Sequence, residues 1–142
     1  MSLKTYDPGL VIVTFKGIIL GGFMSGTFVK AERSEDAYKL SAGSQGEVVR
    51  VRSRRRDGTV TVTLQGSSPT NDLLVAIAIA DEAANSGVGA LSVTDLNGGT
   101  LIASGAAWIR KLPDYEAGDD LSGREWVIDC DQLVMNLAGA DF

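Results

Sequence analysis

Residues 48–65 constrain the fold more than any other part of the chain. They join an arginine-rich segment, an Asp-Gly pair and an alternating threonine and valine segment. An Asp-Gly pair between two alternating segments is a strong signal for a β-hairpin. With a two-residue turn at Asp57-Gly58, the predicted pairs are Arg56 with Thr59, Arg54 with Thr61 and Arg52 with Thr63. Polar side chains then share one face and apolar side chains the other, so the turn and the pattern agree.

This predicted ribbon is strongly basic, although the chain as a whole carries a net charge of −5. Residues 50–56 hold five of the 13 basic residues, namely Arg50, Arg52, Arg54, Arg55 and Arg56. Residues 112–142 hold eight acidic residues and one basic residue, a local charge of −7. Two readings stay open from charge alone: the two regions are complementary between copies of the chain, or both are solvated surfaces.

The 142 residues are expected to form a single domain, 1–142, with a core of its own. Hydrophobic residues make up 44% and charged residues 22%, ordinary values for a globular protein. No apolar segment is long enough to span a bilayer, and the first residues lack the apolar stretch of a secretory leader, so no membrane anchor is expected. The single cysteine, Cys130, has no partner for an internal disulfide, which favours a reducing compartment.

Most of the chain has the short, alternating apolar segments that are typical of β-strands. Strands are expected at 9–15, 18–20 and 27–33, and a second hairpin is expected at 91–96 and 100–109 around an Asn-Gly-Gly turn. In the last strand the apolar phase slips by one residue near Asp131-Gln132, which predicts a bulge or bend there. Residues 34–59 are expected to protrude, with 54–58 near the tip. The prediction is a mainly antiparallel β protein, barrel or sandwich, with one flanking helix.

The one predicted helix begins after Gly66, with Ser68 as a cap and Pro69 in the first turn, and it ends near Asn85. Its apolar residues lie on two sides. Leu73, Ile77 and several alanines share one face, whereas Val75 and Ile79 lie on nearly the opposite side. Because a predicted sheet covers only one side, the second face is interpreted as a contact with another subunit.

No motif for catalysis or cofactor binding is present, and the chain contains no histidine. No enzyme activity and no cofactor are therefore expected. Asp129-Cys130-Asp131 resembles a metal site or a carboxylate pair, but strand alternation favours a core cysteine between two outward carboxylates. Direct binding of nucleic acid is disfavoured because no aromatic residue interleaves with the arginines, and Trp108 and Trp126 are predicted to lie in the core. Docking to an acidic protein surface is the favoured role for the ribbon.

Four segments together resemble a family of bacteriophage tail proteins, the tail tube subunits. They are YDPGLVIVTFKGIILGGFMSGTFVKAERSEDAY, GEVVRVRSRRRDGTVTVTLQGSSPTNDLL, VTDLNGGTL and REWVIDCDQLVM, and they extend over essentially the whole chain. The stretches RDGTVTVTL, SSPTND and NGGT carry the resemblance most specifically. The family resemblance implies the inner tube of a long, contractile tail.

The resemblance implies a fold of two packed antiparallel sheets, a half-barrel or sandwich, with one flanking helix and a long protruding hairpin loop. It implies a structural virion protein, made in the host cytoplasm, whose hexameric rings stack into a tube that conducts the genome. DNA would pass through the lumen without specific binding. The expected partners are other copies of the chain, the sheath, the baseplate and the tail terminator.

Three hypotheses follow for individual residues. The arginine ribbon is expected to contact an acidic part of the next ring, with Asp114, Glu116, Asp119 and Asp120 as its leading partners. Asp129 and Asp131, which share a strand face, are expected to face the lumen. Val75 and Ile79 are expected to lie at the subunit seam. A ring-forming subunit of a bacterial secretion system and a monomeric β-sandwich that binds a ligand stay open as alternatives.

Overall fold

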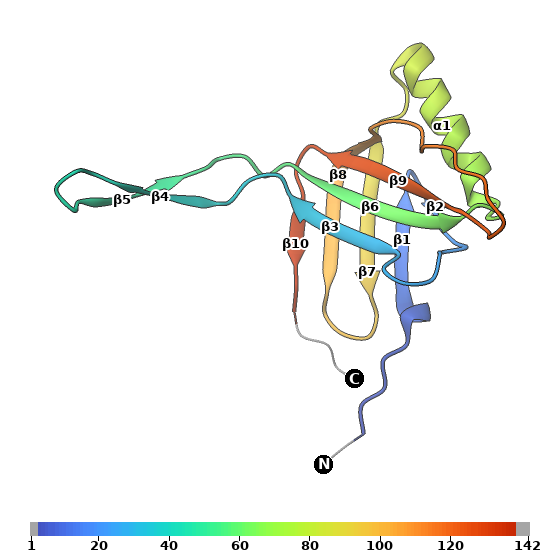
Figure 1. Cartoon of the computed structure of the whole chain (residues 1–142), viewed down its shortest axis with the longest axis horizontal. Helices are drawn as coiled ribbons and strands as arrows, with labels where there is room; N and C mark the ends of the chain where they lie inside the picture. Colours follow the sequence, from blue (N-terminus) through green and yellow to red (C-terminus); the bar gives the residue numbers. More distant parts are fainter. Residues whose placement is uncertain (1–2, 139–142) are drawn as a thin grey trace.

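The computed structural model describes residues 3–138, which form ten strands and one α-helix (Figure 1). The strands are β1 (Val11–Phe15), β2 (Ile18–Ile19), β3 (Val29–Arg33), β4 (Tyr38–Ala42), β5 (Val48–Arg52), β6 (Gly58–Gln65), β7 (Gly89–Asp95), β8 (Leu101–Ile109), β9 (Gly123–Cys130) and β10 (Val134–Asn136). A short 3-10 helix, Pro8–Leu10, precedes β1, and helix α1 (Thr70–Ala84) follows β6. Among the described residues, no helix is both long and apolar enough to cross a membrane.

The main sheet is antiparallel and has the strand order β2-β1-β7-β8-β9-β6-β3, with β10 also paired to β8. Strand β8 forms a corner, because its first residues pair with β10 whereas its last residues pair with β9. Two layers result. In Figure 1 the axes of β1, β7, β8 and β10 are roughly vertical, and the axes of β3, β6 and β9 cross them. The core lies between these layers and includes Phe15, Leu64, Leu91 and Trp126. The predicted two packed antiparallel sheets with one flanking helix are confirmed.

Strand β9 confirms the sequence pattern closely. Trp126, Ile128 and Cys130 are buried, and the residues between them face outward. The chain bends at Asp131 and Gln132, after which Leu133 is buried and β10 begins. The bend is where the chain leaves β9 and continues as β10, so the slip in apolar phase marks a real change of direction. The hairpin of β7 and β8 around residues 97–99 is also confirmed.

The predicted pairing of the arginine segment with residues 59–65 is wrong. Strand β6 pairs with β3 on one edge and with β9 on the other, so Thr59 lies opposite Glu32 and Asp129 and not opposite Arg56. The predicted pairs of Arg54 with Thr61 and Arg52 with Thr63 do not form either. The inner face of β6 is fully buried, and a buried central strand needs a partner on each edge.

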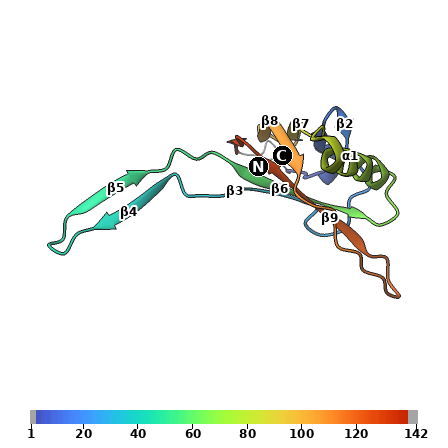
Figure 2. The ribbon, with the colours of Figure 1, turned by 90° about the horizontal axis from the view of Figure 1, so that it is seen from above.

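The arginine-rich strand β5 pairs instead with β4, and the two form a separate sheet that projects from the body (Figures 1 and 2). Its tip is the loop 43–47, where Gly46 has a φ of 84°, a conformation that favours glycine. The long protruding loop is therefore confirmed, but residues 54–58 lie at its base and not at its tip. Gly58 belongs to β6, where a Cβ atom would lie 2.5 Å from the carbonyl oxygen of Glu32. Close packing, and not a hairpin turn, is what requires this glycine.

Helix α1 packs on the core through Leu74 and Ala78, and Thr70 is buried at its first position. The Ser68 hydroxyl donates to the carbonyl oxygen of Gly21 and accepts from the backbone N–H of Thr70 at 3.3 Å. Ser68 thus ties the helix start to the loop after β2. Leu73, predicted to share the main apolar face, is exposed instead. The buried stripe is displaced by one residue from the predicted one.

Candidate assembly surfaces

The hairpin of β4 and β5 is exposed along its whole length. Cross-strand pairing places Tyr38, Leu40 and Ala42 on the same face as Arg52, Arg50 and Val48, whereas Lys39, Ser41, Val49 and Val51 occupy the other face. The guanidinium of Arg50 lies 4.2 Å from the centre of the Tyr38 ring, a cation–π contact. A two-stranded hairpin with exposed apolar side chains is only marginally stable in isolation, so this geometry suits a surface that another chain covers.

The neck, residues 34–37 and 53–57, connects the hairpin to the body. Arg55 joins its two segments, because its guanidinium contacts Glu35 of the other segment at 3.0 Å. It also contacts Asp57, in its own segment, at 2.8 Å. Hydrogen bonds and the charge of Asp57 raise the pKa of Arg55, and the same hydrogen bond holds the pKa of Asp57 below its ordinary value. The Ser53 hydroxyl donates to Glu35 as well. Side-chain hydrogen bonds and ion pairs therefore hold the two segments of the neck together.

These contacts divide the five predicted arginines into two groups. Arg55 and Arg56 are engaged within the chain, since Arg56 donates to the carbonyl oxygens of Ser53 and Arg55. Arg50 is stacked on Tyr38. Within residues 3–138, Arg52 and Arg54 make no ion pair with any acidic side chain. Among the five, Arg52 and Arg54 have neither an ion pair nor a stacking or carbonyl contact within residues 3–138, so their guanidinium groups are the ones free to meet a partner.

A cleft of about 770 Å³ opens beside the neck, between the start of β6 and the ends of β8 and β9. Arg54, Arg56 and Arg110 line it together with Asp129 and Asp131. The Nε and Nη2 atoms of Arg110 donate hydrogen bonds to the Asp129 carboxylate at 3.1 Å and 2.7 Å. The Thr59 hydroxyl donates to the same carboxylate. This ion pair raises the pKa of Arg110. The cleft combines fixed ion pairs with the unpaired charge of Arg54.

Trp108 also lines this cleft and is half-buried, so the prediction that it lies in the core is wrong. Its position on β8 alternates with those of the buried Ala107 and Ile109 and points to the outer side of the sheet. Trp126, in contrast, is buried as predicted. An indole beside arginines at the end of a strand gives the cleft a flat apolar wall.

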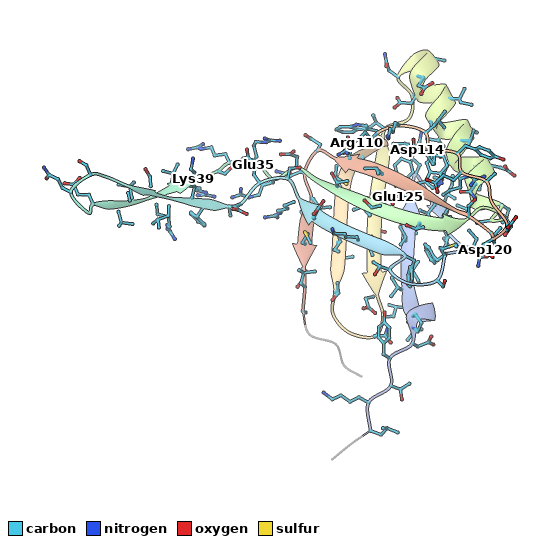
Figure 3. The ribbon with its side chains drawn as sticks, in the orientation of Figure 1. Glu35, Lys39, Arg110, Asp114, Asp120 and Glu125 are labelled. Atoms are coloured by element: carbon cyan, nitrogen blue, oxygen red, sulfur yellow. The ribbon has the colours of Figure 1, made fainter. Side chains whose placement is uncertain are left out.

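The predicted acidic partners lie in the loop 112–122, which leads from the end of β8 to the end of β9 that is farther from the neck. Asp114 lies nearer Arg110, and Asp120 lies near the far end (Figure 3). Asp114, Glu116, Asp119 and Asp120 are all exposed. The Asp114 carboxylate comes within 3.9 Å of Lys111, and the backbone oxygen of Glu116 accepts from the Ser122 hydroxyl. The eight residues of β6, which span roughly 25 Å, separate the end of this loop from the neck, whereas its start follows Arg110, which lines the cleft beside the neck. Within residues 3–138, none of the five predicted arginines forms an ion pair with these acidic residues.

The outer face of β3, β6 and β9 is polar. Thr59, Thr61 and Thr63 alternate outward along β6, and the pairing register places Lys30 and Glu32 on one side of them. On the other side the register places Glu125, Val127 and Asp129. Asp129 thus lies on this face, paired with Arg110, and Asp131 follows it at the bend, exposed. This face, on which the sequence analysis placed the two carboxylates, presents a row of threonine hydroxyls between charged side chains.

Val75 and Ile79 differ in environment. Val75 is half-buried and packs against the core of its own chain, whereas the Ile79 side chain is exposed, with 52% of its surface accessible. Leu73 is exposed in the same helix. Leu73 and Ile79 are thus both open to a partner, on opposite flanks of the helix roughly 120° apart, and Val75 lies at the inner margin beside Ile79.

Cys130 is a core residue, and its burial raises the pKa of the thiol to about 11. Within residues 3–138, no group of three or more cysteine or acidic side chains is placed to hold a metal ion. Asp129, on the neighbouring position, is engaged by Arg110. The Asp-Cys-Asp sequence is explained by strand alternation.

Solved structures of contractile injection machines share this fold. A chain of the anti-feeding prophage cap, which terminates the tube, superposes with a TM-score of 0.60 at 11% identity, covering 97% of this chain and 95% of that one. A chain of the sheath/tube terminator of the extracellular contractile injection system PVC gives 0.59 at 14% identity, covering 96% and 99%. A chain of the PVC sheath–tube complex gives 0.57 at 15% identity, covering 93% and 91%. These similarities concern the fold, which the chain shares with subunits of such machines.

The sequence comparisons identify the family. Structural protein ORF10 of Pseudomonas phage KPP10 is 27% identical over 133 residues, covering 88% of this chain and 77% of the relative. Residues 18–138 match the family described as bacteriophage PhiTE tail tube protein, and the chain belongs to that family. It is a structural protein of the phage tail and a component of the virion, and its family is not one of enzymes.

Proposed function

We propose that hexameric rings of this chain stack into the tail tube and that the genome passes through the tube during ejection. One observation carries the proposal: Arg52 and Arg54 lie in the hairpin and its neck, whereas Asp119 and Asp120 lie in the part of the loop 112–122 that leads to the opposite end of β6 and β9 (Figure 3). Complementary patches at opposite ends of a subunit favour head-to-tail contacts, which generate rings or filaments. The membership of the tail tube family supports the same conclusion.

The contact between rings is assigned to the neck and the hairpin. Arg52 and Arg54 are the leading cations, because Arg55 and Arg56 are engaged within the chain and Arg50 is stacked on Tyr38. Their partners would be the exposed carboxylates of the loop 112–122 in another copy. Such arginine–carboxylate contacts determine register and orientation more than they add affinity.

The contact between neighbours in one ring is assigned to the exposed face of α1. Ile79 would pack against the adjacent subunit, and Val75 would support it from the inner margin of that face. The free edges of the sheet, at β2, β3 and β10, would be covered by neighbouring copies in the same assembly. Covering these edges removes an exposed template for uncontrolled strand pairing.

The lumen is assigned to the outer face of β3, β6 and β9. Its threonine hydroxyls are neutral, and Glu125 and Asp131 contribute negative charge, whereas the charge of Asp129 is offset by Arg110. Carboxylates repel DNA phosphates, and this surface presents few free cations that would retain them. The sheath would then contact the outer wall of the tube, and the baseplate and tail terminator its two ends.

The assembly is tested by light scattering after size-exclusion chromatography, followed by negative-stain microscopy of the purified chain. Long tubes are the expected result. Rings that do not stack would favour a ring-forming subunit of a secretion system, and monomers at high concentration would favour a ligand-binding module.

The charged contact is tested separately by charge reversal. Arg54→Glu should prevent tube growth and leave the far-UV circular dichroism unchanged, whereas Arg54→Lys should still form tubes. Combining Arg54→Glu with Asp119→Arg and Asp120→Arg should restore growth in part. Tubes of normal length from the Arg54→Glu chain would contradict the stacking assignment.

A further inference from the structure

The turn between β7 and β8 contains the one Asn-Gly pair of the sequence, Asn97-Gly98. Although it lies in a turn, Asn97 is buried, with 6% of its surface accessible. Its Nδ2 donates to the Asp95 carboxylate at 2.8 Å and to the backbone oxygen of Asp7 at 2.9 Å. Its Oδ1 accepts from the backbone N–H of Asp7 at 3.0 Å. Two of these three partners therefore belong to a residue ninety positions earlier in the chain.

Asp7 is part of the N-terminal segment, residues 3–10, which is exposed throughout. The β7–β8 turn holds this segment with side-chain and backbone contacts. Asn97 binds both backbone groups of Asp7, and the backbone N–H of Leu96 donates to the carbonyl oxygen of Leu10 at 3.0 Å. The first residues of a chain tend to fray unless such contacts tie them down, so these contacts keep the segment docked.

The docked segment forms one rim of an apolar groove of about 930 Å³. The buried Val93 and Ile102 form the base of this groove, and the half-buried Val29 and Ala31 of β3 form one wall. The N-terminal segment contributes Tyr6, Pro8 and Gly9 to its lining. Release of the segment would therefore remove one side of the groove.

Asn-Gly pairs are chemically labile, because glycine has no Cβ atom to hinder attack by its own backbone nitrogen. The Gly98 nitrogen attacks Cγ of Asn97 and forms a new C–N bond. The Cγ–Nδ2 bond then breaks, and Nδ2 leaves as ammonia with the proton of the Gly98 N–H. The succinimide ring that results adds one water molecule and opens to aspartate or isoaspartate.

The docked geometry opposes this reaction. The Gly98 N–H donates to the carbonyl oxygen of Asp95 at 3.3 Å, so the attacking nitrogen is engaged. The leaving nitrogen, Nδ2 of Asn97, is held by its two acceptors. Both groups become free only when the turn and the N-terminal segment separate, a local opening that leaves the rest of the fold in place.

The product of the reaction does not fit the docked arrangement. A carboxylate at position 97 has no hydrogen to donate, so its oxygen would face two other acceptors, the Asp95 carboxylate and the carbonyl oxygen of Asp7. Two carboxylates at such a distance repel each other, and the Asp7 carbonyl loses one of its donors. The modified chain therefore favours the undocked state.

From these observations we infer that Asn97 is a modification site, at which docking of the N-terminal segment suppresses spontaneous deamidation. The reaction proceeds in the undocked state and its product stays undocked, so the site converts a reversible release of the segment into a permanent one. All the groups involved belong to one chain, and the reaction does not depend on the proposed assembly.

Peptide mass spectrometry of the full chain measures the reaction, with Asn85-Ser86 as an internal reference. Asn85 is exposed in the folded chain, so unfolding should change its rate of deamidation little. Unfolding in urea should accelerate deamidation of Asn97 at least about tenfold relative to Asn85, because the hydrogen bonds that protect it are lost. Equal rates for Asn97 in the native and the unfolded chain would overturn the inference.

A proline variant tests the role of the N-terminal segment. Asp7→Pro removes the N–H that donates to Asn97 and excludes the φ of −119° that Asp7 adopts. The native Asp7→Pro chain should deamidate Asn97 about two- to tenfold faster than the wild type, the factor expected for one hydrogen bond. Thr5→Pro, which places a proline in the same segment and leaves both contacts of Asp7, is the matched control. Adding Gly98→Ala to Asp7→Pro should cancel the increase, because the new methyl group hinders the attack.

The fate of the product is tested with two substitutions that add the same charge. Asn97→Asp places the product in the turn, and Asn136→Asp places it at an exposed position of β10. The first should accelerate amide hydrogen exchange at Leu10 and Leu96 about tenfold or more, since the hydrogen bonds of both amides depend on the docked segment. The second should leave this exchange unchanged.

The outcomes are independent of the proposed function, because tube formation is read by microscopy and deamidation by mass. A native Asp7→Pro chain that deamidates no faster than Thr5→Pro would overturn the inference. Unchanged exchange at Leu96 in Asn97→Asp would overturn it as well. Faster deamidation in Asp7→Pro alone, together with faster exchange in Asn97→Asp alone, would support it.

Discussion

The indole nitrogen of Trp126 donates a hydrogen bond to Oδ1 of Asn71 over 2.9 Å, which ties strand β9 to the first turn of helix α1. Trp126 is buried, and Asn71 also donates its amide nitrogen to the carbonyl oxygen of Gln65 at the end of β6. One side chain therefore joins the helix start to two strands of the sheet. Within the described residues, every buried side-chain nitrogen and oxygen has a hydrogen-bond partner.

Asn71→Ala should lower the free energy of unfolding by about 1–3 kcal/mol, because it leaves the buried indole N–H without an acceptor. Asn71→Asp keeps an acceptor for Trp126 but loses the donor to Gln65, so its loss should be smaller. Glu82→Ala, at an exposed position of the same helix, serves as the control. Urea denaturation followed by tryptophan fluorescence measures all three variants. Equal stability of Asn71→Ala and Glu82→Ala would contradict this role of the hydrogen bond.

Gly58→Ala should destabilise the chain by about 1–3 kcal/mol, because its new methyl group would clash with the carbonyl oxygen of Glu32 and with the Leu133 side chain. Gly105→Ala is the matched control, since a Cβ atom at Gly105 has no neighbour within 4 Å. The control should be neutral or slightly stabilising, because alanine restricts the unfolded chain more than glycine does. Thermal unfolding of the two variants under identical conditions makes the comparison. A tolerated Gly58→Ala would show that the β3–β6 contact can relax.

Cys130 provides a pH test of the core. Its pKa is raised from 9.0 to about 11 by burial, so the unfolded chain ionises this thiol at a lower pH than the folded chain does. The resulting stability is complete below pH 9 and is lost as the pH rises towards 11, by about 3 kcal/mol. Cys130→Ala lacks this contribution, so its unfolding free energy should fall less over the same range. Identical pH dependence in both chains would contradict the burial of the thiol.

The β-rich part of the fold could be predicted from local pattern, and the pairing of the hairpin could not. Alternation in β9 and the Asn-Gly-Gly turn between β7 and β8 are encoded in neighbouring residues. The arginine-rich strand β5 pairs with β4 because both edges of β6 are already taken by β3 and β9. These partners of β6 are far from it in the sequence, so local pattern does not reveal them. Asp57-Gly58 has the composition of a hairpin turn, but Gly58 is required by its packing against Glu32 and Leu133.

The candidate surfaces show the same division between local and distant information. The sequence locates the basic and acidic segments, because charge density needs no structure. It does not reveal that Glu35, twenty residues before Arg55, engages that arginine at the neck. The apolar groove was also missed, since its base comes from β7 and β8 and its wall from β3. The exposed apolar residues of β4 and β5 were the available signal that something must cover the hairpin.

The neck gives the last prediction. Arg55→Ala removes both ion pairs, to Glu35 and to Asp57, so the backbone hydrogen bonds of Ser34 and Ser53 across the neck should open more often. Amide hydrogen exchange in residues 34–57 should accelerate, while global stability should change little, because exposed ion pairs contribute little to it. Arg52→Ala, which removes a cation without an ion pair, is the control.

The pH dependence of this exchange follows from the pKa of Asp57, which its hydrogen bond with Arg55 holds below the ordinary value. The Asp57 carboxylate therefore stays ionised at neutral and mildly acidic pH, and protection of the neck should be lost only as the pH falls through this lowered pKa. In Arg55→Ala the protection should already be low at neutral pH. Exchange rates that are unchanged in Arg55→Ala would show that the backbone alone holds the hairpin in its projecting orientation.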